Sequence, residues 1–458
     1  MTVQPVEIEA GSLASGPIHG ERLAYRLGPD AAGGDLRMRW PPGDATDAVL
    51  RITVAREQWD IARLELTTTD GVVAASAPVD HSDAFEHVDI ALSASVVAAV
   101  GARGGRLRVA DGHEPLVIFG QNTPWSPRLV TAPAGDVGDP RKALLGALAS
   151  PLSLQAFGWK LGCVLDGLAD LHRMTGEARF EDRMRSHLAE YLDSRGTLTY
   201  QDPWGGVRHD EIYGIEGMLP LVGLARTEQR EHALRLCATH AARARRADGA
   251  VADTGVLTTE GMYTVAYPLA VLGELADDQS MLDDAAHQLR VRIPALHVDG
   301  VRLRRYDDGS IEFPNWIRAW TWSLLGLART LPILRGRTVT HDLEAEFAQL
   351  AQRALELRGP DLLWTTYPRE PSTPVETSGS AGLAAALAIG ARSGLLPLAR
   401  LDDARETQAR LMDYVGPEGL LGGASQANKD GERLQRSPRR VNSQVGMGLL
   451  GQLIAHTW

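Results

Sequence analysis

The segment EFPNWIRAWTWSLLGL (312–327) holds the densest group of side chains in the chain that could bind a charged ring. If a helix begins after Asn315, a residue suited to cap it, Arg318 and Trp322 lie one turn apart with Trp316 at the helix start. Burying an arginine without partners is costly, which argues against a plain hydrophobic core. A tryptophan face can stack on a sugar ring, and a guanidinium can pair with a carboxylate through two hydrogen bonds. The segment therefore predicts a binding site for an anionic sugar, and a cation–π cluster at a domain contact is the alternative.

A second candidate for chemistry is the carboxyl group of Asp210 in RHDEIYGIEGMLPLVGLA (208–225). It stands next to His209 and before an apolar stretch, with Trp204 and Tyr213 nearby in the sequence. Burial among aromatic rings would raise the pKa of this carboxyl group, as a proton donor requires. An ordinary helix-capping aspartate is the alternative. We expect Asp210 to be the catalytic acid and base, and we expect His209 and Trp204 to contact the substrate.

The elements that would position these residues form an internal repeat. A glycine between aliphatic residues recurs at intervals of 56, 50, 53, 64 and 61 residues, at Gly167, Gly223, Gly273, Gly326, Gly390 and Gly451. Each marks a stretch that is apolar all round, as is typical of a buried inner helix, and five of the six are followed by an amphipathic stretch. We therefore expect a mainly α chain in which six helix pairs close into a double ring. An open superhelical stack is the alternative.

Residues 1–125 have a different character. Segments such as AVLRITVA, ARLELTTT and PLVIFG are rich in β-branched and aliphatic residues and are separated by Gly, Asp and Pro. This pattern predicts a β-sandwich-like accessory domain, in which we find no catalytic constellation. Residues 126–140 are expected to be a linker, and residues 141–458 the catalytic domain.

Composition excludes several classes of protein. The net charge of −11 argues against a nucleic-acid partner, and no apolar run approaches the roughly 20 residues that cross a bilayer. We find no basic and then apolar leader, so we expect a cytoplasmic protein. Cys163 and Cys237 lie in apolar helical patterns, where buried thiols are expected, and no metal or cofactor motif is present. The expected partner is an anionic oligosaccharide without any cofactor or metal, and the oligomeric state is left open, a homodimer included.

Four segments together resemble the unsaturated uronyl hydrolases of glycoside hydrolase families 88 and 105. The pattern Trp-x-Arg-x-x-x-Trp (316–322) looks like their substrate motif, and VETSGSAGLAAALAIGARSGLL (375–396) is similar to their Glu-Thr-Ser-Gly motif, which places Glu376 at the site. The segment 208–225 resembles the one that carries their catalytic aspartate, and the match falls on Asp210. LGCVLDGLADLHRMTGEARF looks like their first connection from an inner to an outer helix.

The resemblance implies a fold and a reaction. The fold is a six-hairpin (α/α)6 toroid, here preceded by the β-sandwich-like domain. The substrate carries a terminal 4,5-unsaturated uronic acid left by a polysaccharide lyase. An aspartate protonates C4, water adds at C5, and the resulting hemiketal opens and expels the rest of the sugar chain. No metal or organic cofactor is implied.

The chain departs from the family pattern near two inner helices. SLQAFGWKLG, where the relatives carry a second aspartate, contains no acid and offers Trp159 and Lys160 instead. TTEGMYTVAYPLAV lacks the expected histidine and offers Glu260, Tyr263 and Tyr267. We expect Trp159 and Tyr263 to contact substrate, and we consider Glu260 and Glu376 for the second carboxylate, with cap or loop-tethering roles as the alternative.

Other functions remain compatible with these departures. A glucuronidase, a polysaccharide lyase on the same scaffold and a non-catalytic carbohydrate-binding protein are the alternatives. The segment RLRRYDDG (302–309) predicts a hairpin-like loop whose charges are solvated.

Overall fold

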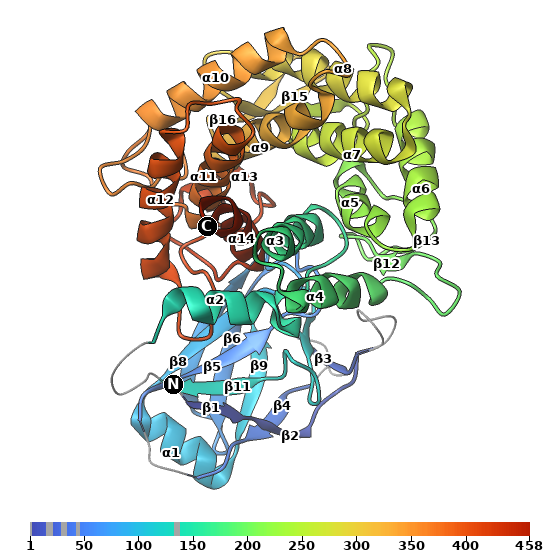
Figure 1. Ribbon diagram of the computed structural model, residues 1–458. Helices are drawn as coiled ribbons and strands as arrows, with labels where there is room; N and C mark the ends of the chain where they lie inside the picture. Colours follow the sequence, from blue (N-terminus) through green and yellow to red (C-terminus); the bar gives the residue numbers. More distant parts are fainter. Residues whose placement is uncertain (1, 15–21, 29–33, 43–45, 132–137) are drawn as a thin grey trace. The chain divides into compact units, whose positions relative to one another are not determined.

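The computed structural model describes residues 2–14, 22–28, 34–42, 46–131 and 138–458 (Figure 1). The chain divides into two compact units, one of residues 1–139 with 201–207 and one of residues 140–200 with 208–458. Within the described part of the chain, no helix is long and apolar enough to cross a membrane.

The first unit is rich in antiparallel sheet. One sheet has the strand order β1-β11-β5-β8 and another the order β2-β4-β9-β6-β7, and a third ladder joins β10 to β3. The helix α1 (Ala94–Arg103) connects two of the strands. The strands are β1 (Thr2–Pro5), β2 (Glu7–Ala10), β3 (Ala24–Leu27), β4 (Leu36–Arg39), β5 (Ala48–Thr53), β6 (Ile61–Thr68), β7 (Val73–Asp80), β8 (His87–Leu92), β9 (Gly105–Ala110), β10 (Leu116–Phe119) and β11 (Arg128–Thr131).

Alternation of buried and exposed residues along the strands creates the core of this unit. In β4, Leu36 and Met38 are buried while the residues between and after them are exposed, so one face of the strand points inward. Both larger sheets contribute to one hydrophobic cluster, for example Leu50 from β5 and Leu64 from β6. The expected linker 126–140 is wrong in part, because Arg128–Thr131 pairs with two neighbouring strands as β11. Residues 132–137 of that linker lie outside the described residues.

The second unit is built from helices of two kinds. The inner, apolar ones are α3 (Trp159–Thr175), α5 (Pro220–Ala225), α7 (Tyr267–Ala276), α9 (Ile317–Leu334), α11 (Thr377–Arg392) and α14 (Gln444–Thr457). The amphipathic ones are α2 (Pro140–Leu148), α4 (Ala178–Ala189), α6 (Arg230–Arg243), α8 (Gln279–Leu296), α10 (His341–Glu356) and α12 (Arg400–Leu411). The contrast follows the sequence pattern: α11 is buried along nearly its whole length, whereas α12 buries only three residues.

Each inner helix packs on the next along the chain, and α14 packs back on α3. In Figure 1 these helices lie inside a layer formed by α4, α6, α8, α10 and α12. Two of the repeated glycines explain how close the helices come. A Cβ atom on Gly167 would collide with the backbone of Gly448 in α14, and one on Gly326 would collide with the backbone of Met262. At these two positions the helices can approach only because the side chain is absent.

Two inner helices begin with a non-α turn. A 3₁₀ turn, η3 (Ile215–Met218), precedes α5, and a π-helical turn, η4 (Met262–Ala266), precedes α7. Such turns have a different number of residues per turn from an α-helix, so they change the direction in which side chains point around the helix axis. π-helical turns are also frequent at functional sites. The remaining elements are β12 (Thr199–Gln201), β13 (Val207–His209), β14 (Val256–Thr258), β15 (Arg302–Tyr306), β16 (Ile311–Pro314), the short α13 (Gly431–Arg436) and the 3₁₀ turns η2 (Pro151–Ser153) and η5 (Met412–Tyr414).

Candidate active site

The tryptophan- and arginine-rich segment opens α9. The helix begins at Ile317, and Trp316 is its N-cap residue, without a side-chain cap. The expected capping role of Asn315 is wrong, because its side chain accepts a hydrogen bond from the Val301 amide, 3.2 Å away, in the preceding hairpin. Trp316 and Trp322 are both buried, and so is Arg318.

Arg318 is held rigidly at the start of α9. Its guanidinium lies over the Trp316 ring at 4.3 Å from the centroid and donates to the Ser425 carbonyl oxygen at 2.7 Å. It also donates to the carbonyl oxygen of Gln426. Both acceptors lie in the loop before α13, so this loop and α9 fix the position of one buried positive charge.

Glu376 caps the next inner helix. Its carboxylate accepts from the amide of Gly379 and, at 2.6 Å, from the Ser378 hydroxyl, both in the first turn of α11. It also accepts from the Ser425 amide at 2.9 Å and lies 3.7 Å from Arg318. Through these contacts the Glu376 carboxylate holds the loop before α13 to the starts of α9 and α11.

An aromatic cluster links three inner helices. The Trp159 and Trp322 rings meet edge to face at 5.3 Å between centroids, and Tyr263 stacks on Trp322 at 6.1 Å. Among the described residues, the buried indole N–H of Trp322 has no hydrogen-bond partner. Three residues expected from sequence to contact the substrate are thus in contact with one another.

A group of carboxyls lies at the starts of the second and third inner helices. Glu216 stands in η3, and the Tyr213 hydroxyl donates to it at 2.9 Å. Glu260 precedes η4, and Asp253 accepts from the Ile215 amide at 3.2 Å. Burial raises the pKa of Glu216 to about 8, and the nearby Glu260 and Asp253 carboxylates add to the rise. Glu216 keeps part of its surface open to solvent, so a protonated acid remains accessible.

Three cations balance these carboxyls. Lys160, in the first turn of α3, opposes the rise in the Glu216 pKa. Burial also raises the pKa of Glu260, while Arg304 and Arg318 act to lower it. The sequence expectation that the charges of 302–309 are solvated is therefore wrong for Arg304, although β15 and β16 do form the expected hairpin.

Asp210 has very different surroundings. It follows β13 in a left-handed conformation (φ 56°) and pairs with His232 at 2.5 Å and Arg235 at 2.6 Å on α6. Although burial on its own would raise it, these two partners hold the pKa of Asp210 below its ordinary value. An ionised carboxylate is the opposite of a proton donor. The catalytic role of Asp210 stays a prediction that these contacts do not favour.

Two further expected residues lie near Asp210 in the chain. His209 is exposed on β13, where its Nδ1 lies 3.3 Å from the Thr199 hydroxyl. Trp204 belongs to residues 201–207, which group with the first unit, and its side chain is 70% exposed. Their substrate contacts stay predictions.

Glu216 is the residue that the sequence interpretation missed. It lies six residues after Asp210, and its signal was a lone acid inside the otherwise apolar run IEGMLPLVGLA. A short loop, residues 211–214, separates Asp210 from Glu216 and connects β13 to η3. Within the described ranges, Glu216, Glu260 and Asp253 do not bring three ligand atoms close enough to hold one metal ion.

Comparisons with known proteins identify a family and similar folds. The sequence profile of Glycosyl Hydrolase Family 88 matches residues 150–453, whereas no curated protein matches the chain. Among solved structures, a possible member of glycoside hydrolase family 105 from Salmonella enterica has a TM-score of 0.59 at 15% identity, covering 73% of this chain and 97% of its own. A family 105 glycoside hydrolase from C. acetobutylicum has a TM-score of 0.59 at 16% identity, with 70% and 98% covered. An unsaturated glucuronyl hydrolase from a Bacillus species has a TM-score of 0.54 at 18% identity, with 70% and 96% covered.

Proposed function

The chain belongs to Glycosyl Hydrolase Family 88, and from this premise we propose that it removes a terminal 4,5-unsaturated uronyl residue from anionic oligosaccharides. Membership makes it a glycoside hydrolase, and similar folds include an unsaturated glucuronyl hydrolase. We further propose that the second unit is a six-hairpin (α/α)6 toroid, since six inner helices pack in sequence and α14 packs on α3.

Glu216 is the proposed acid of this reaction. It stands half-buried at the start of the second inner helix, close to the Glu260 and Asp253 carboxylates, and this placement, which raises its pKa and favours the protonated form, carries the proposal. The protonated carboxyl group donates its proton to C4 of the double bond, and water adds to C5. The Glu216 carboxylate then takes a proton from that water, so the acid is restored. The hemiketal at C5 opens, and the remaining sugar chain leaves from C1.

The other residues of the site suit an anionic ring. Lys160, Arg304 and Arg318 place three positive charges around the carboxyls, which favours a substrate that carries a carboxylate. The half-buried Trp159 ring, at the start of α3, supplies an apolar face for the sugar, and the buried rings of Trp322 and Tyr263 pack behind it.

The test compares two carboxylates in one assay. A lyase-generated unsaturated disaccharide absorbs in the ultraviolet, and the absorbance falls when its double bond is hydrated. We expect Glu216→Gln to slow this loss by roughly 10²–10⁴-fold, the usual contribution of a general acid. The matched variant Asp210→Asn should keep turnover close to that of the wild-type protein.

The opposite ranking would overturn the role of Glu216 and restore that of Asp210. Absorbance that instead rises from an intact polysaccharide would indicate a lyase. Saturable binding of uronides, with no absorbance change in either direction, would leave only a carbohydrate-binding protein.

A further inference from the structure

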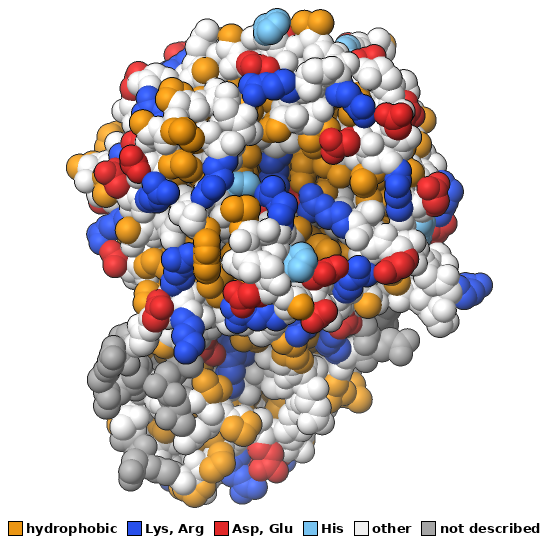
Figure 2. Space-filling model, viewed as in Figure 1, with side chains coloured by type: hydrophobic (Ala, Val, Ile, Leu, Met, Phe, Trp, Pro, Cys, Tyr) orange, Lys and Arg blue, Asp and Glu red, His pale blue; other side chains and the backbone are white. Residues whose placement is uncertain are grey.

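A second pocket lies at the other ends of the inner helices. Its cavity of about 650 Å³ is lined mainly by residues near the C-terminal ends of α3, α5, α7, α9, α11 and α14, together with Tyr267 at the start of α7 and two residues of α4. The residues proposed to act on uronides stand instead at the starts of these helices, so the two sites do not share side chains. Figure 2 shows Lys and Arg side chains gathered around the hollowed middle of the face on which these helix ends lie. The size is typical of a site for a small organic molecule.

The charges around this cavity favour an anion. Four arginines line it, Arg173, Arg226, Arg329 and Arg392, against the three carboxylates of Asp170, Glu181 and Glu274. Two of those carboxylates are already paired, and the pairs of Asp170 also occupy Arg173 and Arg329. Asp170 forms ion pairs with Arg329 at 2.5 Å and with Arg173 at 3.1 Å, and Glu181 forms an ion pair with Arg185 at 3.1 Å. Arg392 donates to the carbonyl oxygens of His456 and Trp458, so Arg226 is the arginine that the carboxylates of the lining leave available.

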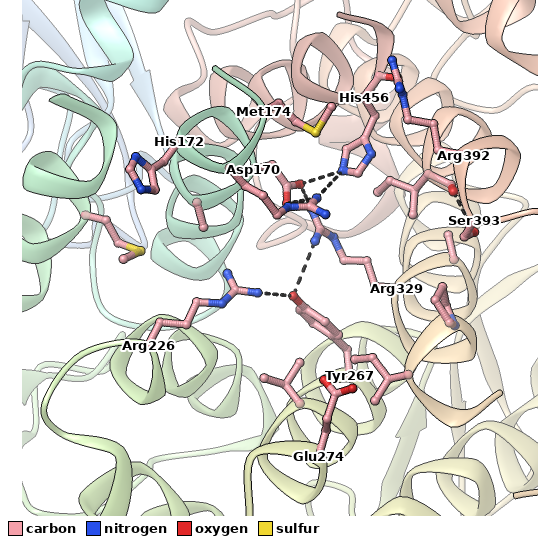
Figure 3. Close-up of a pocket in the computed structure, with 18 of the residues that line it drawn as sticks. Asp170, His172, Met174, Arg226, Tyr267, Glu274, Arg329, Arg392, Ser393 and His456 are labelled. Atoms are coloured by element: carbon pink, nitrogen blue, oxygen red, sulfur yellow. Dashed lines mark hydrogen bonds and ion pairs between the residues drawn. The ribbon is translucent and has the colours of Figure 1, made fainter. Parts of the chain in front are cut away.

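Arg226 carries a charge that its main partner does not neutralise. Its guanidinium donates to the Tyr267 hydroxyl at 3.1 Å, a neutral group. The nearest carboxylate is Asp166 at 3.7 Å, which also accepts from Tyr263 at 2.5 Å. Burial raises the pKa of Asp166, although Arg329 and Arg226 act to lower it. Figure 3 shows Arg226 reaching into the pocket from one side, with Arg392 and His456 across from it.

His456 offers a second polar group. Its Nε2 lies 3.2 Å from Asp170, while its Nδ1 is buried and, in the described part of the chain, has no hydrogen-bond partner. The rest of the lining is largely aliphatic, including Met174, Val271 and Ile389. Basic residues commonly stand at helix C-termini because they complement the helix dipole, but that role requires no cavity between them.

We propose that this pocket binds a small monocarboxylate with an apolar body, whose carboxylate pairs with Arg226. The body lies against the aliphatic walls, and the ligand is distinct from the uronide substrate. The inference does not depend on the proposed hydrolase reaction, because no residue of the pocket belongs to the site at the helix starts.

The test uses hexanoate as the probe and the neutral hexanamide as its isostere, titrated calorimetrically into the intact protein. We expect saturable binding of hexanoate and much weaker binding of hexanamide. Arg226→Gln should weaken hexanoate binding by about tenfold or more, the usual effect of a lost charge-assisted hydrogen bond. The control is Arg195→Gln, because Arg195 is 83% exposed and does not line the pocket, and it should bind as the wild-type protein does.

A second variant keeps every charge and fills the space. Leu275→Trp, in the wall at the end of α7, should abolish hexanoate binding while leaving hydration of the unsaturated disaccharide intact. Equal binding of the acid and the amide, unchanged affinity in both variants, or absence of saturable hexanoate binding in the wild-type protein would overturn the proposal. Loss of disaccharide turnover in a wild-type protein that still binds hexanoate would overturn only the hydrolase reaction.

Discussion

Two carboxyls six residues apart show how surroundings decide a side chain's chemistry. Burial and the nearby Glu260 and Asp253 carboxylates disfavour the charged form of Glu216, whereas His232 and Arg235 favour the charged form of Asp210. The residue type is nearly the same and the direction of the pKa shift is opposite. Only the protonated group can act as an acid at neutral pH, so the position of a carboxyl in space matters more than its match to a motif.

The hydroxyl of Tyr213 gives a pH-dependent prediction. It donates to Glu216 at 2.9 Å and thereby lowers the pKa of that carboxyl. In the wild-type protein, kcat/KM should fall as pH rises through about 8, because the acid loses its proton. Tyr213→Phe removes the hydrogen bond, so this fall should move to higher pH. The measurement is kcat/KM against pH with the unsaturated disaccharide.

Glu260→Gln is the matched control with the opposite sign. The Glu260 carboxylate raises the pKa of Glu216, so its neutral replacement should move the fall in kcat/KM to lower pH. If both variants moved the fall in the same direction, a group other than Glu216 would control the profile.

At the scale of elements, the helices were more predictable than their first turns. The glycine repeat and the apolar stretches located all six inner helices, because burial on every side leaves a clear pattern. The resemblance to family 88 is confirmed by the profile match. The site was less predictable, because η3 and η4 depart from α geometry and the proposed acid lies beyond the loop that follows the motif position. Loops have no sequence periodicity from which their path could be predicted. Asp253 and Arg304, which lie in other segments of the chain, therefore could not be assigned to the site from sequence.

The contact between α3 and α14 can be tested with two glycines. Gly167→Ala should destabilise the protein by about 1–3 kcal/mol, because the new methyl group would collide with the backbone of Gly448. Gly146→Ala in α2 is the control, since open space surrounds that position, and it should stabilise by up to about 1 kcal/mol. Urea unfolding of both variants measures the difference. Equal effects would mean that the close approach does not limit the packing.

At the scale of the whole molecule, buried acids tie stability to pH. The folded Glu216 carboxyl has a pKa of about 8, against an ordinary value of 4.5, so between these values the folded protein holds a proton that the unfolded chain has lost. Stability contributed by this proton is complete below about pH 4.5 and is lost as pH rises to about 8.

Unfolding by denaturant from about pH 5 to about pH 8 should therefore show a free energy that falls with pH, by at most about 1.4 kcal/mol per unit for this one group. Glu216→Gln should make the fall shallower, because the amide does not titrate. Asp210→Asn should change the slope in the acidic range instead, since the pKa of Asp210 is lowered. An unchanged slope in Glu216→Gln would contradict the raised pKa.

The polar side chains between the inner helices bear on the path that a bound sugar can take. Asp166, Tyr263 and Gln452 are buried and bonded to one another through Tyr263, and Gln452 also donates to the Cys163 carbonyl at 3.1 Å. They fill space between the inner helices, so under the proposed function a sugar bound at the helix starts would have to leave by the route along which it entered. Such an arrangement would not pass a polymer between the two ends of the helices, in keeping with the proposed removal of one terminal residue at a time.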